Sequence, residues 1–258
     1  MLLPTMTKAL FVLTEDWFFV SHFQPMARAV ARLGIEVVVS ARESAAARTI
    51  TNFGYRFIPH EIGRSGLNPI GVAKSVLALR KIIAAERPDV VHAIALPPVV
   101  VAAMATIGTG AQVILAPTGL GHLWLEQDVA TVAARKAVRS LVASVGKRTS
   151  VHFLFENAED PSVFGLNAGN AAKVTLVGGA GVASEPFAPL PTSPPMRVAV
   201  VARMTAPKGI SPVVEAVRRL RRTGRDIRLD LYGMPDVANR RSIPETTLRT
   251  WSEVEGIA

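Results

Sequence analysis

Apolar segments of strand length alternate with helical segments along most of this 258-residue chain. The first such unit consists of an apolar strand at residues 9–14, a helix at residues 21–33 and a valine-rich strand at residues 35–40. This alternation predicts parallel strands, because a strand can pair in parallel with its predecessor only after a crossover connection, usually a helix. The sequence therefore predicts a doubly wound α/β sheet covered by helices.

The alternation continues, with one interruption, to the end of the chain. Before the interruption it predicts strands at residues 55–59, 89–92, 112–117, 151–155 and 173–177, and helices at residues 69–86, 98–107 and 129–147. Residues 184–195 contain five prolines, which is typical of a stiff connection. After it the pattern predicts strands at residues 197–202 and 227–232, and helices at residues 209–223 and 242–251. Ser242 and Glu245 have the spacing of a capping box at the start of the last helix.

These elements divide the chain into three predicted parts. They are an N-terminal Rossmann-like domain at residues 1–183, a proline-rich linker at residues 184–195 and a partial second Rossmann-like domain at residues 196–258. Two strands and two helices bury too little apolar surface to form a stable core alone. We therefore expect the second domain to be incomplete.

The composition excludes several classes of protein. The chain has no cysteine, which rules out disulfides, thiolate metal sites and a cysteine nucleophile. Its most apolar segment, residues 93–107, contains two prolines and is shorter than the ~20 residues of a membrane span. The first apolar segment, residues 9–13, is too short for a signal peptide, so we expect a cytoplasmic protein.

The formal net charge of +9 favours anionic partners. Aromatic residues make up only 6% of the chain, and the basic residues are spread over helices instead of alternating with aromatics as in proteins that bind single strands. We therefore expect no nucleic-acid partner. A solvated basic face and peripheral association with an anionic inner membrane leaflet both remain open.

Loops that directly follow strands are the candidate sites, since ligands of open parallel sheets bind outside the carboxyl ends of the strands. The first loop, residues 15–22, combines Glu15, Asp16, three aromatic residues, Ser21 and His22. Asp16 or His22 could act as the general base that removes a proton from an acceptor hydroxyl. Alternatively, Asp16 or Ser21 caps the following helix.

Three further loops and a glycine-rich segment are expected at the cleft. Their candidate residues are His92, Thr118, Gly119, Gly121, Glu156, Asn157, Gly179 and Gly181. Glycines let a ligand approach the backbone closely, but they also serve ordinary tight turns. A histidine at a strand end can equally be structural, and Glu156 and Asn157 can equally cap a helix.

The segment after the strand at residues 197–202 is the most informative. Arg203 and Lys208 lie five residues apart, and Gly209 begins the next helix. Two cations and the free N–H groups of a helix N-terminus suit a diphosphate. The alternative is two solvent-exposed cations.

Together these segments resemble glycosyltransferase group 1, also called family 4, whose GT-B fold has two Rossmann-like domains that face a cleft. The resemblance rests on residues 15–22, 89–98, 118–121 and 179–182, and on Arg203, Lys208 and Gly209. It implies a retaining hexosyltransferase that moves a sugar from a UDP-sugar to a lipid-linked or polysaccharide acceptor in envelope or exopolysaccharide synthesis. Arg203 and Lys208 would hold the diphosphate, and neither a metal nor a cofactor is expected.

The chain departs from the family pattern at two points. Ala183 stands where the family commonly has aspartate, and the family's Glu-x7-Glu donor region is not found before Ala258. The resemblance therefore also implies a C-terminal truncation, and the alternative is a non-catalytic or half-enzyme homologue that needs a partner chain. A nicotinamide dehydrogenase is a weaker interpretation, because no Gly-x-Gly-x-x-Gly follows the first strand.

Overall fold

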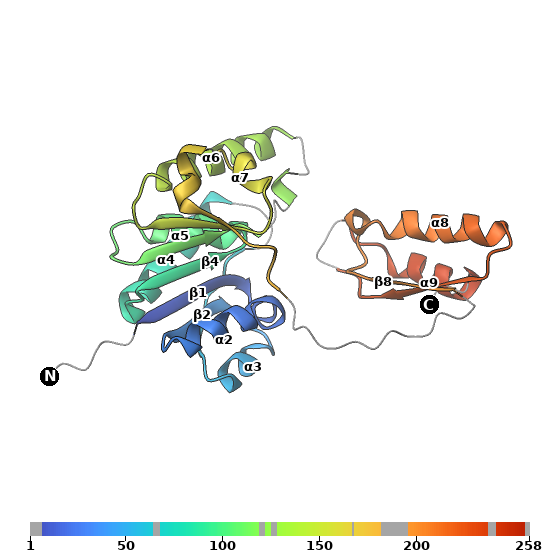
Figure 1. Ribbon diagram of the computed structural model, residues 1–258, viewed down its shortest axis with the longest axis horizontal. Coiled ribbons are helices and arrows are strands. Elements are labelled where there is room, and N and C mark those ends of the chain that lie inside the picture. The colour runs from blue at the N-terminus through green and yellow to red at the C-terminus, as the bar shows by residue number, and fades with distance from the viewer. Residues whose placement is uncertain are drawn as a thin grey trace. The chain divides into compact units, whose positions relative to one another are not determined.

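The computed structural model describes residues 7–63, 68–118, 122–124, 128–166, 168–181, 196–236 and 241–255. The chain divides into two compact units, Met1–Ser184 and Glu185–Ala258, which are shown in Figure 1. The predicted linker, Ala183 and the glycines Gly119 and Gly121 lie outside the described residues.

The first unit is built on a parallel sheet with seven strands in its described residues, in the order β3-β2-β1-β4-β5-β6-β7. The strands are β1 (Lys8–Glu15), β2 (Glu36–Arg42), β3 (Arg56–Pro59), β4 (Val90–Ile94), β5 (Gln112–Ala116), β6 (Val151–Phe155) and β7 (Val174–Leu176). The strand order reverses between β1 and β4, so the ligand-binding switch point of a doubly wound sheet lies where these two strands end.

Helices pack against both faces of this sheet (Figure 1). The helical elements are α1 (Asp16–Phe18), the π-helical turn η1 (Phe19–Phe23), α2 (Gln24–Arg32), α3 (Ala47–Asn52), α4 (Pro69–Glu86), α5 (Leu96–Ala105), η2 (His122–Trp124), α6 (Val129–Val145), α7 (Asp160–Val163) and η3 (Ala168–Lys173). One buried core joins α4, α5 and α6 to the sheet, with Leu79 and Val142 as members. The other contains Phe11, Phe19 and Ile50 from β1, η1 and α3.

One prediction about the first unit was wrong, and one helix was missed. Residues 15–22 were expected to form a loop, but the chain becomes helical at Asp16, directly after β1. Helix α3 was not predicted at all, because its six residues give less than two turns of periodicity and include two threonines and an isoleucine. Tertiary packing decides this segment, since Ile50 is fully buried in the core with Phe11 and Phe19.

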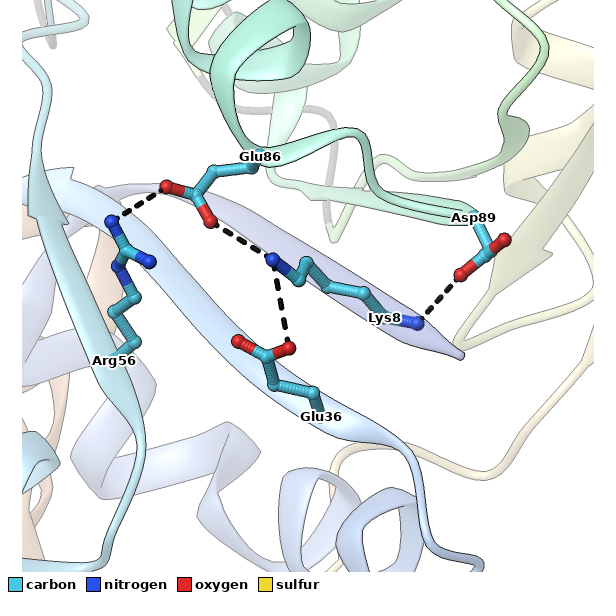
Figure 2. A network of polar contacts seen from close by, with 5 residues as sticks. All are labelled: Lys8, Glu36, Arg56, Glu86 and Asp89. Carbon is cyan, nitrogen blue, oxygen red and sulfur yellow. Dashed lines mark hydrogen bonds and ion pairs between the residues drawn. The ribbon is translucent and has the colours of Figure 1, made fainter. Parts of the chain in front are cut away.

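An ion-pair network joins the amino ends of β1, β2 and β3 to the end of α4 (Figure 2). Glu86 is buried and accepts from Lys8 Nζ at 3.2 Å and from Arg56 Nη2 at 2.9 Å, and Lys8 Nζ also lies 3.5 Å from Glu36. The backbone amide of Lys8 donates to Asp89 at 2.7 Å. A buried carboxylate without these cations would be costly, so the network fixes this edge of the sheet. The carboxyl edge of the sheet is the opposite one.

The second unit contains a parallel pair of strands in its described residues, β8 (Met196–Val201) and β9 (Ile227–Tyr232). Its helical elements are η4 (Ala206–Lys208), α8 (Ile210–Arg222) and α9 (Glu245–Glu255). They enclose a core that includes Met204, Val214, Leu229 and Trp251.

The capping box predicted at Ser242 is not formed. The last helix begins three residues later, at Glu245, and residue 242 forms an antiparallel bridge with Thr205. The Ser242 hydroxyl accepts from the amide of Asp236 at 3.0 Å and lies 3.4 Å from the carbonyl of Met204. These long-range partners take the place of the local capping bond.

Candidate functional site

The switch point of the first unit is occupied by the helical segment α1–η1. It follows β1, and the left-handed Ala95, with φ 75°, follows β4 at the same edge of the sheet. A positive φ is costly for alanine, so the fold imposes this turn. The residues that could reach a ligand here come from α1–η1 and from the start of α5.

Asp16 is fully buried at the start of α1. Its carboxylate accepts from the amide of Ser44 at 2.6 Å, from the Ser44 hydroxyl at 2.6 Å and from the amide of Trp17 at 2.7 Å. The partner Ser44 follows β2, so this contact ties together the carboxyl ends of neighbouring strands. Nothing in the sequence pattern indicated Ser44. The geometry gives Asp16 a structural role and leaves His22 as the accessible candidate base in this segment.

Glu15 ends β1 and is buried. One of its carboxylate oxygens lies 3.8 Å from Nη1 of Arg42, which ends β2. The register of β1 against β2 shifts between Val12 and Glu15, so the strand is irregular where it reaches the switch point. Glu15 therefore pairs with Arg42 where β1 and β2 end at the switch point.

His22 is exposed and lies in the π-helical turn η1. Its Nδ1 is 2.7 Å from the hydroxyl of Ser21, and its ring lies 4.8 Å from the ring of Phe18. Short π-helical turns inside helices are frequent at functional sites. Of the two candidate bases in residues 15–22, Asp16 and His22, only His22 is exposed to a substrate from solvent.

His92 was predicted as the last residue of a strand, and the structure corrects where that strand ends. Strand β4 continues to Ile94, so His92 is two residues inside it. The imidazole is 5% exposed and lies 5.3 Å from the ring of Phe11. Burial lowers the pKa of His92 to about 4. His92 is therefore a neutral core residue.

The remaining candidates in the first unit follow other strands at the same edge. Thr118 is half-buried two residues after β5. Asn157 accepts from the amides of Glu159 and Asp160 at 3.1 and 2.9 Å, so it caps α7, and Glu156 beside it is half-buried. After β7, Gly179 and Gly181 both have positive φ, at 117° and 81°. The parallel sheet thus brings these loops to one edge, as expected from the sequence.

In the second unit, Arg203 and Lys208 flank the entry to α8. Both side chains are exposed, and Gly209 has the left-handed φ of 72° that turns the chain from η4 into the helix. Nη1 of Arg203 donates to Asp236 at 2.8 Å. The backbone amide of Asp236 in turn donates to the hydroxyl of Ser242. The sequence indicated neither Asp236 nor Ser242 as part of this site, because both are more than 30 residues away along the chain.

A cavity of about 720 Å³ lies away from these candidates. It is lined by the end of α4 and by the segments that lead into β4 and β5, including Arg80, Arg87, Asp89 and Gln112. It is therefore at the amino edge of the sheet, where ligands of doubly wound folds do not usually bind.

Comparison with known families identifies the first unit. The family model described as "Glycosyl transferase 4-like" matches residues 8–149, more than half of the chain. The chain belongs to the glycosyl transferase 4-like family. The resemblance noted in the sequence is thereby confirmed. No curated protein matches this glycosyl transferase 4-like chain.

Solved structures similar to this glycosyl transferase 4-like protein share the GT-B fold, which confirms the expected fold class. A glycosyltransferase from Rickettsia africae ESF-5 is 16% identical over 98% of this chain and 65% of its own, with a TM-score of 0.63. Sucrose-phosphate synthase from Thermosynechococcus elongatus is 14% identical over 98% and 68%, with a TM-score of 0.68. HepE from Anabaena, in complex with UDP and glucose, is 12% identical over 97% and 65%, with a TM-score of 0.58.

The glycosyl transferase 4-like chain thus spans 65% of the length of the Rickettsia protein. None of the helices in its described residues has both the length and the apolar composition needed to cross a membrane. Within the same residues, no three His, Asp or Glu side chains are grouped so that they could hold a metal ion. The lack of a metal or cofactor remains a prediction.

Proposed function

We propose that this chain binds the diphosphate of a UDP-sugar and takes part in transferring the sugar, with retention, to a lipid-linked or saccharide acceptor. The observation that carries the proposal is the grouping of Arg203, Lys208 and Gly209 at the start of α8. The proposed donor is supported by the family membership of the chain and by HepE, which was solved with UDP-glucose.

The entry to α8 has the chemistry that a diphosphate requires. Helix α8 begins with the amides of Ile210 and Ser211. The amide of Val213, further along, donates to the carbonyl oxygen of Gly209 at 3.3 Å. The earliest amides of a helix have no partner within the helix. The early amides and the helix dipole favour an anion, and Lys208 adds a positive charge. Asp236 holds Arg203 through one nitrogen, which leaves further N–H groups of its guanidinium for phosphate oxygens.

These cations would also supply the electrostatic part of catalysis. When the bond between the sugar and the diphosphate breaks, negative charge grows on the leaving UDP, and Arg203 and Lys208 would stabilise it. In the first unit, His22 would accept the proton of the acceptor hydroxyl, while Asp16 and Ser44 hold the segment that carries it. We propose Thr118, Glu156, Gly179 and Gly181 as further residues of the substrate site at the carboxyl edge of the sheet in the first unit.

A second candidate is a homologue that binds UDP but transfers sugar only when another chain completes it. It is supported by the second unit, whose described residues form a sheet of two strands, which is too few for an independently stable sheet. Both candidates predict UDP binding, and they differ in turnover by the chain alone.

We further propose that the acceptor is met in the cytoplasm at an anionic membrane surface, as part of envelope or exopolysaccharide synthesis. The support is the formal charge of +9, which attracts the chain to anionic headgroups. We expect flotation with phosphatidylglycerol vesicles at low salt and none with neutral vesicles. Equal behaviour with both kinds of vesicle would contradict this part of the proposal.

Calorimetric titration of the chain with UDP tests the donor site. We expect Arg203→Ala and Lys208→Ala each to weaken UDP binding about 10- to 100-fold, because each removes a charge-assisted bond worth about 1.5–3 kcal/mol. Arg197→Ala is the matched control, since Arg197 lies in β8, the strand that precedes Arg203, and likewise pairs with an aspartate at 2.8 Å, here Asp230. It should leave UDP affinity unchanged.

Two results would overturn the assignment. The first is that Arg203→Ala binds UDP as tightly as the parent. The second is that Arg197→Ala loses as much UDP affinity as Arg203→Ala. Each would show that the α8 entry is not the diphosphate site. Binding of NAD in the same titration would instead favour the dehydrogenase interpretation.

A further inference from the structure

Ser21 makes two kinds of contact in the π-helical turn. Its hydroxyl is 2.8 Å from the carbonyl oxygen of Trp17 and 3.3 Å from that of Phe18. The same hydroxyl is 2.7 Å from Nδ1 of His22, the next residue. Such a serine could merely bond back to its own helix, as serines often do. The contact with the imidazole means that Ser21 also affects the protonation of the His22 ring.

The number of hydrogens on these groups decides which ring nitrogen of His22 carries the proton. A serine hydroxyl has one hydrogen, and a carbonyl oxygen can only accept. The hydrogen of Ser21 is therefore used toward Trp17 and Phe18, so at the imidazole the hydroxyl must accept. The hydrogen of that contact must come from Nδ1. In neutral His22 the lone pair is then on Nε2.

The surroundings of His22 suit a base. The side chain is exposed, and in the described part of the chain its Nε2 has no hydrogen-bond partner. The ring is also held from one side by Phe18, at 4.8 Å between ring centroids. A hydrogen bond at Nδ1 and a ring contact together fix the direction of Nε2, and fixed direction is what proton transfer in a bound complex needs.

We propose that Ser21 is a positioning residue that keeps His22 protonated on Nδ1, so that Nε2 is the atom that receives the acceptor proton. This inference rests on the proposed function. As the acceptor oxygen bonds to the anomeric carbon from the face that UDP leaves, which gives retention, its proton moves to Nε2 and the electron pair of the breaking sugar–phosphate bond leaves with UDP. The imidazolium that forms still donates from Nδ1 to Ser21, so the contact persists in the charged state.

The tautomer can be measured without any substrate. We expect long-range ¹⁵N–¹H spectra of the full chain, labelled at histidine, to show neutral His22 protonated on Nδ1. The His22→Gln variant assigns the signal among the five histidines. In Ser21→Ala the proton should move to Nε2, whereas Ser21→Thr, which keeps the hydroxyl, should retain the parent spectrum.

Steady-state kinetics test whether the contact between Ser21 and His22 affects the rate of sugar transfer. We expect Ser21→Ala to lower kcat about tenfold with little change in KM, and His22→Gln to lower it about 100-fold. Ser21→Thr should restore kcat to within about twofold of the parent. Ser162→Ala is the matched control, because Ser162 is also an exposed helical serine that bonds to a carbonyl, that of Glu159, at 2.8 Å.

The outcomes separate this inference from the proposed function. A parent His22 protonated on Nε2, or a tautomer unchanged in Ser21→Ala, overturns the role of Ser21 whatever the activity. A tautomer that shifts with no change in kcat overturns its catalytic part. If the parent transfers no sugar to any acceptor, the proposed activity fails, and the spectra still decide whether Ser21 controls His22.

Discussion

Replacing Gly233 with alanine is expected to unfold the second unit and to leave the first unit folded. Gly233 follows β9 with φ 155°, and a Cβ there would lie 1.8 Å from the carbonyl oxygen of Ala202. The backbone would have to move apart, which breaks the bonds from Ala202 to Tyr232 and from Met204 to Met234, both 3.0 Å. We expect a loss of about 4 kcal/mol, because strain and lost hydrogen bonds add.

That loss is a large share of the whole stability of a unit of this size, roughly 4–11 kcal/mol at typical values per residue. Hydrogen exchange followed by mass spectrometry should show β8 and β9 losing protection while β1 and β4 keep theirs. The change would also separate Arg203 from Asp236, because both follow the two strands that Gly233 brings together. UDP binding should be lost with it.

Gly224→Ala is the control for this prediction. Gly224 also has a positive φ, 81°, but a Cβ there would meet nothing within 4 Å. Gly224→Ala should lower the free energy of unfolding by about 1 kcal/mol, which is the local backbone strain alone. Equal protection of β9 in the Gly233 variant and the Gly224 variant would show that the close approach to Ala202 is not important.

Acid is expected to destabilise the first unit through His92. Burial lowers the pKa of His92 to about 4, below the ordinary value of 6.5, so the unfolded chain binds a proton that the folded chain does not. The stabilisation is present above pH 6.5 and is lost as the pH falls toward 4. We expect a loss of about 2 kcal/mol at pH 5 and about 3 kcal/mol at pH 4, relative to pH 7.5.

Urea unfolding of the parent and of His92→Leu at pH 7.5 and pH 5 measures this contribution. The difference between the two proteins should change by about 2 kcal/mol over that interval, because leucine cannot take up a proton. Ile114→Val, at the position paired with His92 on β5, should keep the parent's dependence on pH. An identical pH dependence of the parent and His92→Leu would refute the buried neutral state.

Long, strongly periodic segments were predicted well. Helix α4 has the expected bounds, Pro69–Glu86, and strand β9 has the expected bounds, Ile227–Tyr232. Periodicity records which faces are buried, and a proline or glycine marks where each segment ends. The order of the elements then restricts the sheet to parallel connections, which the structure confirms. The GT-B fold was expected only from the resemblance to a family, and the similar solved structures confirm it.

Short or exceptional segments were predicted poorly. The helical start at Asp16 was missed because it depends on Ser44, 28 residues away, and not on a local cap. The strand that contains His92 was predicted to end two residues early, because the apolar residues after it continue from strand to helix without a polar break. In both cases contacts between distant residues outweigh the local signal.

The sequence by itself determined the α/β class, the parallel sheet and the loops in which a site had to lie, because local periodicity and chain order control all three. Only the tertiary structure decided the roles of individual side chains. It buried Asp16 and His92, left His22 exposed beside Ser21, and paired Arg203 with Asp236. Those roles depend on which polar groups meet across tens of residues, and a buried polar group must find such a partner or stay neutral.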